Sequence, residues 1–414
     1  MTSRLSDRPD VVITGLGVTT AVGQGKDEFT TALFEGRHAF APLRRPGRSL
    51  PADGPARAFL GAEIEELAVP GAFPARMLRT ASLSARAALV TLGEAWHEAG
   101  LDDADPTRVG LVVGGSNVQQ RELTRWHARH ADHPEFIRPS YGLAFMDTDL
   151  CGFCTELFPI RGFAHTLGGA SASGLLAVLQ AVWAVRSGQV DVCVALGALM
   201  DLSYWECLAF RAMGAMGSHR FADDPGAACR PFDRQRDGFI FGEACGAVVV
   251  EREGARRHPE PYARVLGVAT AVDGNRNPDP ALAGEIGVIE GALAEAGLSA
   301  GDIEYVNPHG TGSPIGDETE LRALAKCGLG GARINATKSI TGHGLSAAGA
   351  VEVVATLLQM RERRLHPTRN LVDPVDPSFP WVRQESLPFA FETAISLSMG
   401  FGGLSSAICL RKWR

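Results

Sequence analysis

The sequence predicts an α/β fold with mixed β-sheets, arranged as two similar halves. Short apolar runs alternate with glycine turns and helical segments along most of the chain, which is typical of this class. The 414 residues are enough for two core-forming units. Because the pattern of strand, glycine turn and helix starts again after residue 260, we expect halves at residues 1–255 and 256–414, divided near residues 252–260.

In the first half, apolar runs bounded by glycine or polar residues indicate buried strands, and longer periodic segments indicate helices. The expected strands are residues 11–17, 109–113 and 191–196, and the expected helices are residues 75–99, 119–133 and 171–186. Residues 37–72 are rich in Pro, Gly, Ala and Arg, and are expected to cross the surface as a loop.

The second half continues the same alternation. The expected strands are residues 262–272, 302–306, 394–397 and 406–410, and the expected helices are residues 284–296, 316–326 and 346–360. Glycine pairs such as Gly114-Gly115 and Gly402-Gly403 indicate tight turns and close backbone approach rather than disorder.

The charge and hydropathy of the chain exclude several classes of function. The formal net charge of −7 leaves no basic excess to neutralise phosphates, which argues against nucleic acid as the main partner. No run approaches the roughly 18 apolar residues of a membrane span. Residues 1–10 are polar, carry charges of both signs and lack the apolar core of a signal peptide. We therefore expect a cytoplasmic protein.

The cysteines and histidines do not predict a metal site. Most of the eight cysteines stand in apolar runs and are expected to be buried free thiols. Cys151 and Cys154 form a single C-x-x-C, which is a weak signal for redox or zinc chemistry without a second pair. His127, His130 and His133 recur every three residues, but no carboxylate or cysteine completes a ligand set, so a solvated or interface face is favoured.

The first stretch with catalytic potential is Gly-Gly-Ala-Ser-Ala-Ser-Gly at residues 168–174, directly before an apolar helix. Small residues let a substrate reach a side chain at the helix N-terminus, where free N–H groups favour a developing anion. The alternative is an ordinary N-cap, for which serine is a preferred residue. Ser171 is therefore a candidate only in combination with other residues.

Three further stretches place reactive side chains in glycine turns. His309 stands between a predicted strand and a glycine loop, followed by Asp317 and Glu320. His343 stands in a second glycine turn before a helix, five residues after Lys338. The third stretch is the glycine loop Ser-Met-Gly-Phe-Gly-Gly at residues 398–403.

Together these stretches resemble the β-ketoacyl-acyl-carrier-protein synthases of fatty-acid and polyketide pathways, in the same order and over nearly the whole chain. A central signature of that family is also matched, by Arg230-Pro231-Phe232-Asp233, Arg236-Asp237-Gly238-Phe239 and Gly242-Glu243. The resemblance implies a thiolase fold, with mixed β-sheets layered between helices, and a homodimer.

The resemblance also assigns roles to individual residues. The nucleophilic cysteine of the family maps to Ser171, its two catalytic histidines to His309 and His343, and its lysine to Lys338. Phe401 matches the aromatic gate beside the pocket, and the backbone N–H groups of Ser171 and Phe401 would form an oxyanion hole. Thr311 and Gly402, which lie in the matched motifs, are expected to contact the substrate.

Three positions depart from the family pattern. Ser171 replaces the cysteine, Cys245 stands in a Gly-Glu-Ala-Cys-Gly stretch that is usually Gly-Glu-Gly-Ala-Gly, and Leu404 replaces an asparagine after the terminal glycine loop. A thiol at a helix N-terminus readily becomes a thiolate, whereas a serine hydroxyl needs an adjacent general base. In the family, both histidines bind the thioester carbonyl of a malonyl-carrier protein. If His309 and His343 do the same, no base is left for Ser171.

Decarboxylation needs only hydrogen-bond donors aimed at the oxygen that gains charge. The segment Gly-Gly-Ala-Ser-Ala-Ser-Gly at residues 168–174 is similar to that of ketosynthase-like enzymes that carry serine and decarboxylate malonyl-carrier protein during polyketide β-branching. The expected substrate is malonyl-acyl-carrier protein, whose phosphopantetheine arm enters with the substrate, and the products are acetyl-carrier protein and CO₂. No resident cofactor or metal is expected.

Other interpretations stay open at this point. Ser171 could be an oxygen nucleophile in an acyltransferase or true synthase, with His309 or His343 as its base. The chain could be a non-catalytic chain-length partner in a heterodimer with an active ketosynthase, although such partners often lose part of the His and Lys machinery. A degenerate, regulatory thiolase-fold subunit is a third alternative.

Overall fold

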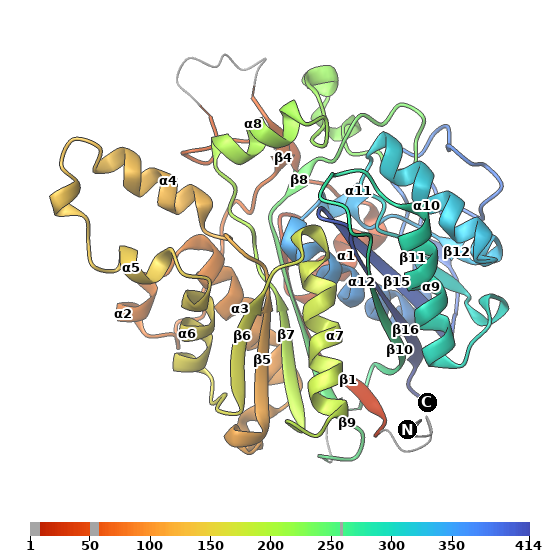
Figure 1. Ribbon diagram of the computed structural model, residues 1–414, viewed down its shortest axis with the longest axis horizontal. Helices are drawn as coiled ribbons and strands as arrows, with labels where there is room; N and C mark the ends of the chain where they lie inside the picture. Colours follow the sequence, from red (N-terminus) through yellow and green to blue (C-terminus); the bar gives the residue numbers. More distant parts are fainter. Residues whose placement is uncertain (1–8, 50–57, 257–259) are drawn as a thin grey trace.

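The computed structural model describes residues 9–49, 58–256 and 260–414 (Figure 1). Within these residues, 11 strands form one large sheet with the order β12-β11-β15-β16-β10-β1-β9-β7-β5-β6, and β2 pairs with β1. The strands are β1 (Val11–Thr20), β2 (Gly23–Gln24), β5 (Val109–Gly114), β6 (Phe163–Leu167), β7 (Val192–Gly197), β9 (Ala244–Arg252), β10 (Ala263–Val272), β11 (Tyr305–Asn307), β12 (Arg333–Ile334), β15 (Thr393–Gly400) and β16 (Leu404–Lys412).

The sheet repeats the same arrangement on both sides of its centre, where β1 and β10 pair antiparallel. From β1 outward, β9 and β7 follow in antiparallel pairing, and β5 and β6 follow in parallel pairing. From β10 outward, β16 and β15 are antiparallel, and β11 and β12 are parallel. All strands of the first set precede residue 253 and all of the second follow residue 262, so each half of the sheet comes from one part of the chain.

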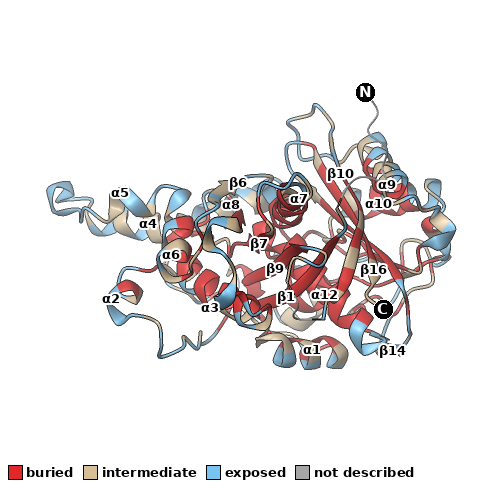
Figure 2. Ribbon diagram, turned by 90° about the horizontal axis from the view of Figure 1, so that it is seen from below, coloured by how far each residue is buried: buried red, intermediate tan, exposed pale blue. Residues whose placement is uncertain are grey.

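Helices lie on the outside of the two half-sheets and between them (Figures 1 and 2). Helix α3 (Leu83–Glu98) covers β1 and β9, and α9 (Leu282–Ala296) covers β10 and β16. Helices α7 (Ser173–Arg186) and α12 (Ala348–Glu362) pack against each other and against strands of both halves. Every residue from Ala348 to Met360 is buried, as expected for a helix that is apolar on all sides.

The remaining elements surround this centre. The other helices are α1 (Lys26–Glu35), α2 (Ala75–Leu78), α4 (Gln120–Arg129), α5 (Tyr141–Ala144), α6 (Thr148–Leu157), α8 (Tyr204–Ala212), α10 (Pro314–Lys326) and α11 (Lys338–Thr341). Short strands β3 (Phe40–Pro42), β4 (Leu60–Ala62) and β8 (Phe241–Gly242) form one small sheet, and β13 (Arg364–Leu365) and β14 (Leu387–Pro388) form another. In the described part of the chain, no helix has the length and apolar character that crossing a membrane would need.

Most elements predicted from the sequence are confirmed within a few residues, with corrections in the first half. The single helix expected at residues 75–99 is wrong, because α2 and α3 are separate. Ser82 caps the start of α3, where its Oγ accepts a hydrogen bond of 3.1 Å from the N–H of Ala85. Strands β6 and β9 lie outside every strand range that the sequence predicted.

The segment at residues 37–72 is more than the surface loop that the sequence predicted. It contributes β3 and β4, and the side chain of Arg48 is completely buried. Residues 50–57 of this segment lie outside the described residues, as do residues 1–8 of the polar N-terminal stretch and residues 257–259 of the expected boundary.

Two glycines allow α7 and α12 to touch at their N-terminal ends. A Cβ atom on Gly174 would lie 2.7 Å from the Ser346 carbonyl oxygen and 2.8 Å from the Ala350 nitrogen. A Cβ atom on Gly349 would lie 2.7 Å from the nitrogen of Leu175. Because these neighbours are backbone atoms, they cannot rotate away, and only glycine permits this approach.

We expect Gly349→Ala to destabilise the protein by about 1–3 kcal/mol, because the added methyl group overpacks the contact between the two central helices. The control is Gly287→Ala on α9, where nothing lies within 4 Å of the added Cβ and where alanine should stabilise the helix by up to about 1 kcal/mol. Urea unfolding of the purified variants measures both changes. Equal unfolding midpoints for the two variants would contradict the proposed contact.

Candidate active site

Ser171 lies in a 3₁₀ turn, Ala170–Ala172, that leads directly into α7. Ala170 has a φ of 48°, a left-handed conformation that is uncommon for a residue other than glycine. The hydroxyl of Ser173 closes this turn, because it accepts a hydrogen bond from the Gly169 N–H at 2.9 Å and donates one to the Ala170 carbonyl at 2.7 Å. The hydroxyl of Ser398, which lies on β15, donates a hydrogen bond to the Ser171 carbonyl at 3.2 Å. The main chain at Ser171 is thus held on both sides.

His343 and His309 reach Ser171 from the other half of the chain. The Nε2 atom of His343 lies 2.9 Å from the Ser171 hydroxyl oxygen. The His309 ring lies nearly perpendicular to the His343 ring, with the centroids 5.5 Å apart. The main chain of His343 is fixed by hydrogen bonds to Ile240 (2.7 Å) and from Gly242 (3.1 Å).

The surroundings of each imidazole place its proton on Nε2. The Lys338 ammonium lies 3.5 Å from Nδ1 of His309 and also donates to the His309 carbonyl, so its positive charge disfavours a proton on Nδ1. Nδ1 of His343 is buried and has no hydrogen-bond partner among the described residues. Because a buried unpaired N–H is costly, Nδ1 is the unprotonated nitrogen there too. Both rings then present an Nε2–H donor.

Burial also keeps both histidines neutral. It lowers the pKa of His309 and of His343 well below the ordinary value, and the charge of Lys338 lowers both further. The Lys338 ammonium itself is paired with the buried Glu352 carboxylate. The site therefore holds two neutral hydrogen-bond donors beside one hydroxyl.

Two carboxylates of α10 hold the loop that carries His309. Glu320 accepts hydrogen bonds from the N–H groups of His309 (2.5 Å) and Gly310 (2.8 Å). Asp317 accepts from the N–H groups of Phe232 (2.6 Å) and Gly312 (3.1 Å). Burial raises the pKa of Asp317 to about 6 and that of Glu320 to about 7. Both residues belong to the pocket wall, but their carboxylates already accept hydrogen bonds from the main chain and hold the loop of His309 in place.

The central signature seen in the sequence fixes loops around the site. The Arg236 guanidinium lies 3.4 Å from the Asp317 carboxylate. The carboxylate of Asp233 accepts from the N–H groups of Val372 and Asp373, both at 2.9 Å. A Cβ atom on Gly310 would lie 2.6 Å from the Phe232 ring, so this ring packs directly beneath the histidine loop.

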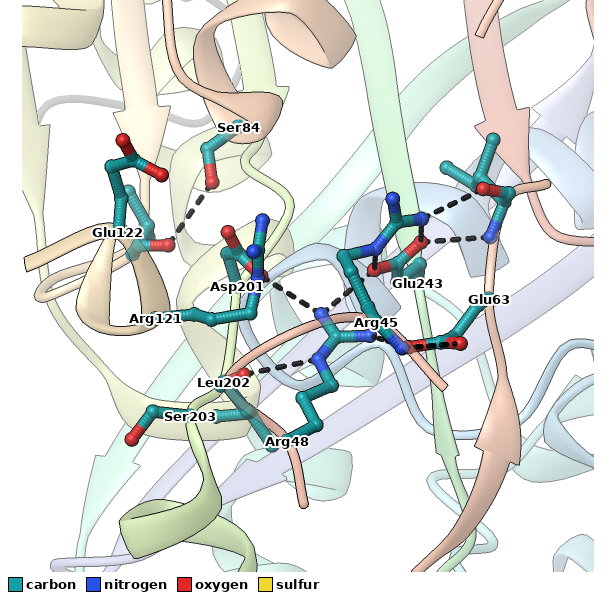
Figure 3. A network of polar contacts seen from close by, with 12 residues as sticks. Arg45, Arg48, Glu63, Ser84, Arg121, Glu122, Asp201, Leu202, Ser203 and Glu243 are labelled. Carbon is teal, nitrogen blue, oxygen red and sulfur yellow. Dashed lines mark hydrogen bonds and ion pairs between the residues drawn. The ribbon is translucent and has the colours of Figure 1, made fainter. Parts of the chain in front are cut away.

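A buried ion network joins loops and strands of the first half of the chain (Figure 3). Arg48 pairs with Asp201 at 2.8 Å, Glu243 at 2.7 Å and Glu63 at 2.7 Å. Burial alone would lower the pKa of Arg48, but the three carboxylates raise it above its ordinary value. Arg45 adds a second pair with Glu243 at 2.8 Å. Glu243 thereby anchors the segment that carries Arg45 and Arg48.

A pocket joins these residues, and its wall includes Ser171, His309, Thr311, His343 and Phe401. Gly400 lies against the Ser171 turn, because a Cβ atom on it would lie 2.2 Å from the Gly169 carbonyl oxygen. Its successor Phe401, with 39% of its surface exposed, stands at the pocket beside this turn.

Gly402, Leu404 and Cys245, which were also singled out in the sequence, lie outside the pocket wall. Gly402 is exposed and is not in the pocket wall, although its neighbours Gly400 and Gly403 are. The Leu404 side chain packs against Gly169, because a Cβ atom on Gly169 would lie 3.0 Å from it. Cys245 is completely buried in β9.

The cysteine and histidine clusters lie away from the pocket. Cys151 and Cys154 are buried in α6, and burial raises the pKa of Cys151 to about 11. His127 contacts the Tyr141 hydroxyl at 2.7 Å, and His133 pairs with Glu135 at 3.2 Å. Across the described ranges, no group of three or more His, Cys, Asp or Glu side chains could hold a metal ion.

The sequence did not single out two acidic residues in the pocket wall, Asp273 and Glu285. Glu285 occupies a buried position on the otherwise apolar inner face of α9. A carboxylate at such a position is the available signal, since charged residues are rarely buried without a partner.

Comparisons with known proteins place the whole chain in one family. Residues 8–255 match the model of the β-ketoacyl synthase N-terminal domain, and residues 262–372 match that of the C-terminal domain. The chain is 58% identical over 405 residues to the polyketide biosynthesis malonyl-ACP decarboxylase PksF of Bacillus subtilis, covering 97% of this chain and 96% of the relative. It is 28% identical over 414 residues to 3-oxoacyl-[acyl-carrier-protein] synthase 2 of Coxiella burnetii, covering 97% and 98%.

Solved structures agree with this assignment. A β-ketoacyl synthase from Burkholderia phymatum superimposes with a TM-score of 0.87 at 27% identity, over 98% of this chain and 100% of the other. The ketosynthase AntDE in complex with the type II acyl-carrier protein AntF gives a TM-score of 0.87 at 25% identity, over 99% and 100%. The thiolase fold expected from the sequence is confirmed.

We expect Arg48→Met to destabilise the protein by about 1.5–3 kcal/mol, because it removes the cation that Asp201 and Glu243 share and leaves each with one other arginine, Arg121 and Arg45. The matched control is Arg37→Met, which removes an exposed pair with Glu35 and should change stability by less than about 1 kcal/mol. Chemical unfolding measures both variants. If Arg48→Met unfolds at the same denaturant concentration as the control, the network does not support the fold.

Proposed function

Because the chain belongs to the β-ketoacyl synthase family, we propose that it is a decarboxylase of that family, which converts malonyl-acyl-carrier protein into acetyl-acyl-carrier protein and CO₂. The observation that carries this proposal is the 2.9 Å contact between the Ser171 hydroxyl and Nε2 of His343, with the buried His309 ring packed against the His343 ring. The Bacillus subtilis relative PksF is a malonyl-ACP decarboxylase, which supports the same conclusion.

The two histidines supply what decarboxylation requires. The thioester carbonyl of the malonyl group accepts hydrogen bonds from Nε2–H of His309 and of His343. When CO₂ leaves, the electron pair of the broken C–C bond moves into this carbonyl and forms an enolate. The two donors stabilise the enolate oxygen more strongly than the neutral carbonyl, which lowers the barrier. A proton added to the α carbon then gives the acetyl group.

Ser171 explains why the enolate does not condense with a second acyl group. In the free protein the Nε2–H group of His343 donates to the Ser171 hydroxyl, and in the substrate complex it donates to the malonyl carbonyl instead. In neither state does His343 present a basic nitrogen to Ser171, so it cannot deprotonate the hydroxyl. Without a base, a serine hydroxyl is a weak nucleophile. No acyl group is loaded, and the malonyl-derived enolate has only a proton to react with.

The proposed partner is an acyl carrier protein, whose phosphopantetheine arm brings the malonyl group into the pocket. The AntDE:AntF complex, in which a ketosynthase of the same fold binds a carrier protein, supports this partner. The mechanism needs no resident metal or cofactor, because the two histidines provide the charge stabilisation.

We also propose that the protein is a homodimer. Helices α4 and α5 form an arm that projects from the body of the molecule (Figures 1 and 2). Large apolar side chains are exposed on and near it, namely Phe136, Ile137, Leu143, Phe145 and Met146. Strand β6 ends the large sheet and leaves an edge for pairing. Such a combination is typical of an interface.

The dimer is tested by Leu143→Asp combined with Phe145→Asp, which places charge on the arm. We expect light scattering to give the mass of two chains for the parent protein and of one chain for the variant, because buried charge opposes association. Glu135→Lys, an exposed change on the same segment, is the control. A parent protein with the mass of a single chain at micromolar concentration would exclude the homodimer.

The proposed reaction is tested by intact mass spectrometry of the enzyme and of malonyl-acyl-carrier protein incubated together. We expect the carrier to change from malonyl to acetyl while the enzyme mass stays constant. His309→Ala should slow this conversion by about 10²–10³-fold, because it removes one of two donors to the enolate. His133→Ala, far from the pocket, should have no effect.

A further variant and two other outcomes separate the alternatives. Ser171→Cys should become acylated by an acyl-carrier protein, since a thiol at a helix N-terminus readily ionises. An acyl adduct on Ser171 of the parent protein, or a 3-ketoacyl product, would make it a serine acyltransferase or synthase instead. Activity only in the presence of a second ketosynthase would indicate a chain-length partner subunit.

A further inference from the structure

Glu285 is a buried carboxyl group in the wall of the pocket that holds Ser171, His309 and His343. It lies in the first turn of α9, and only 2% of its surface is exposed. Its Oε2 atom has no hydrogen-bond partner in the described part of the chain. A carboxyl group buried in this way is expensive unless it is paired with a cation or stays protonated.

The groups that face Glu285 are acidic. Asp273, which follows β10, rests on the same turn of α9, because a Cβ atom on Gly284 would lie 1.7 Å from its Oδ1 atom. Asp317 and Glu320 approach from α10, which packs against α9. The other titratable side chains on elements packed against α9 include the thiols Cys327 and Cys409, and burial raises the pKa of each.

The two buried cations beside the histidine loop, Arg236 and Lys338, already have partners. Arg236 contacts Asp317 at 3.4 Å and Glu318 at 2.9 Å. Lys338 pairs with Glu352 and contacts His309.

Burial first, and then the negative charges of Glu320, Asp273 and Asp317, raise the pKa of Glu285 from 4.5 to about 9. At neutral pH the carboxyl group is therefore protonated and can donate.

The proposed reaction needs a proton that the other catalytic groups do not supply. Both histidines are neutral donors, and if either gave up its Nε2 proton it would become an imidazolate, which is far too basic. The Ser171 hydroxyl is a similarly poor acid. A neutral carboxylic acid has a suitable acidity for transfer to an enolate carbon.

We propose that Glu285 is the proton donor that converts the enolate into the acetyl group, an inference that rests on the proposed decarboxylase function. The C–C bond to the carboxylate breaks, CO₂ leaves, and the electron pair forms the enolate. When the enolate collapses to the thioester carbonyl, its α carbon forms a bond to the Glu285 proton. The resulting Glu285 carboxylate takes a proton from water before the next turnover.

The experiment follows two fates of the enolate in one sample. Malonyl-acyl-carrier protein is incubated with enzyme in ¹³C-bicarbonate buffer with carbonic anhydrase, and acetyl product and ¹³C in the recovered malonyl group are measured by mass. An enolate that is not protonated promptly recaptures CO₂ and acquires the label. The variant is Glu285→Gln, which keeps the shape of the side chain, and the control is Glu290→Gln, an exposed glutamate on the same helix.

We expect the parent protein and Glu290→Gln to form acetyl product without labelling the malonyl group. Glu285→Gln should form acetyl product roughly 10²-fold more slowly, and its ratio of ¹³C label to acetyl product should rise at least about 10-fold, because a general acid has been removed. Glu285→Asp, which keeps an acid but shortens it, should fall between the two. In the parent protein turnover should decline above pH 9, and this decline should be absent in Glu285→Gln.

A stability measurement reports the protonation of Glu285 independently. Between pH 4.5 and about 9 the unfolded chain releases the Glu285 proton while the folded chain keeps it, so this group lowers stability as the pH rises through that window. Glu285→Gln should therefore raise the unfolding midpoint at pH 8 and leave it nearly unchanged at pH 4.5.

The remaining outcomes separate this inference from the proposed function. If Glu285→Gln matches the parent in both turnover and labelling, Glu285 is not the donor. A slower variant with an unchanged ratio of label to product would likewise overturn the inference, since the residue would then be only structural. A parent protein that releases no CO₂ would refute the decarboxylase function, and this inference with it.

Discussion

The contact between the N-terminal ends of α7 and α12 is the constraint on which the rest of the structure depends. Gly174 and Gly349 let the two backbones approach to a distance that any side chain would prevent. Ser171 precedes one of these helices and His343 precedes the other, so their 2.9 Å contact follows from the helix contact. Because the two helices come from different halves of the chain, the site exists only when both halves are folded and packed.

The electrostatic design of the pocket follows from its burial. Lys338 is matched by Glu352, and Asp317 by Arg236, so these charges are balanced and can organise loops without acting on the substrate. The two histidines carry no charge, and they act through oriented N–H groups. Among the buried carboxyl groups of the pocket wall, Glu285 is the one for which the described residues provide neither a cation nor a hydrogen bond to Oε2. Its isolation favours a chemical role over a structural one.

Much of this arrangement could be predicted from the sequence, because it is recorded in local patterns. Apolar runs beside glycines marked most strands, and the motifs around Ser171, His309 and His343 carried the family resemblance. The buried position of Arg48 could not be predicted, because its partners Asp201 and Glu243 are far away in the chain. The same holds for the approach of Asp317 and Glu320 to Glu285, although the position of Glu285 on an apolar helix face was a local signal for that residue alone. Long-range contacts of this kind leave no periodic signal, and they override the local preference of an arginine-rich segment for the surface.

The left-handed turn at Ala170 has a consequence for how such proteins diversify. The turn, and the hydrogen bonds of Ser173 and Ser398 that hold it, depend on the main chain and not on the side chain at position 171. Serine and cysteine differ there by a single atom, oxygen or sulfur, on an otherwise identical support. The same main-chain support can thus carry a residue suited to condensation or one suited to decarboxylation alone. When genomes are read, the residue at this position therefore has to be examined beside the overall similarity, because synthases and a decarboxylase share that similarity to this chain.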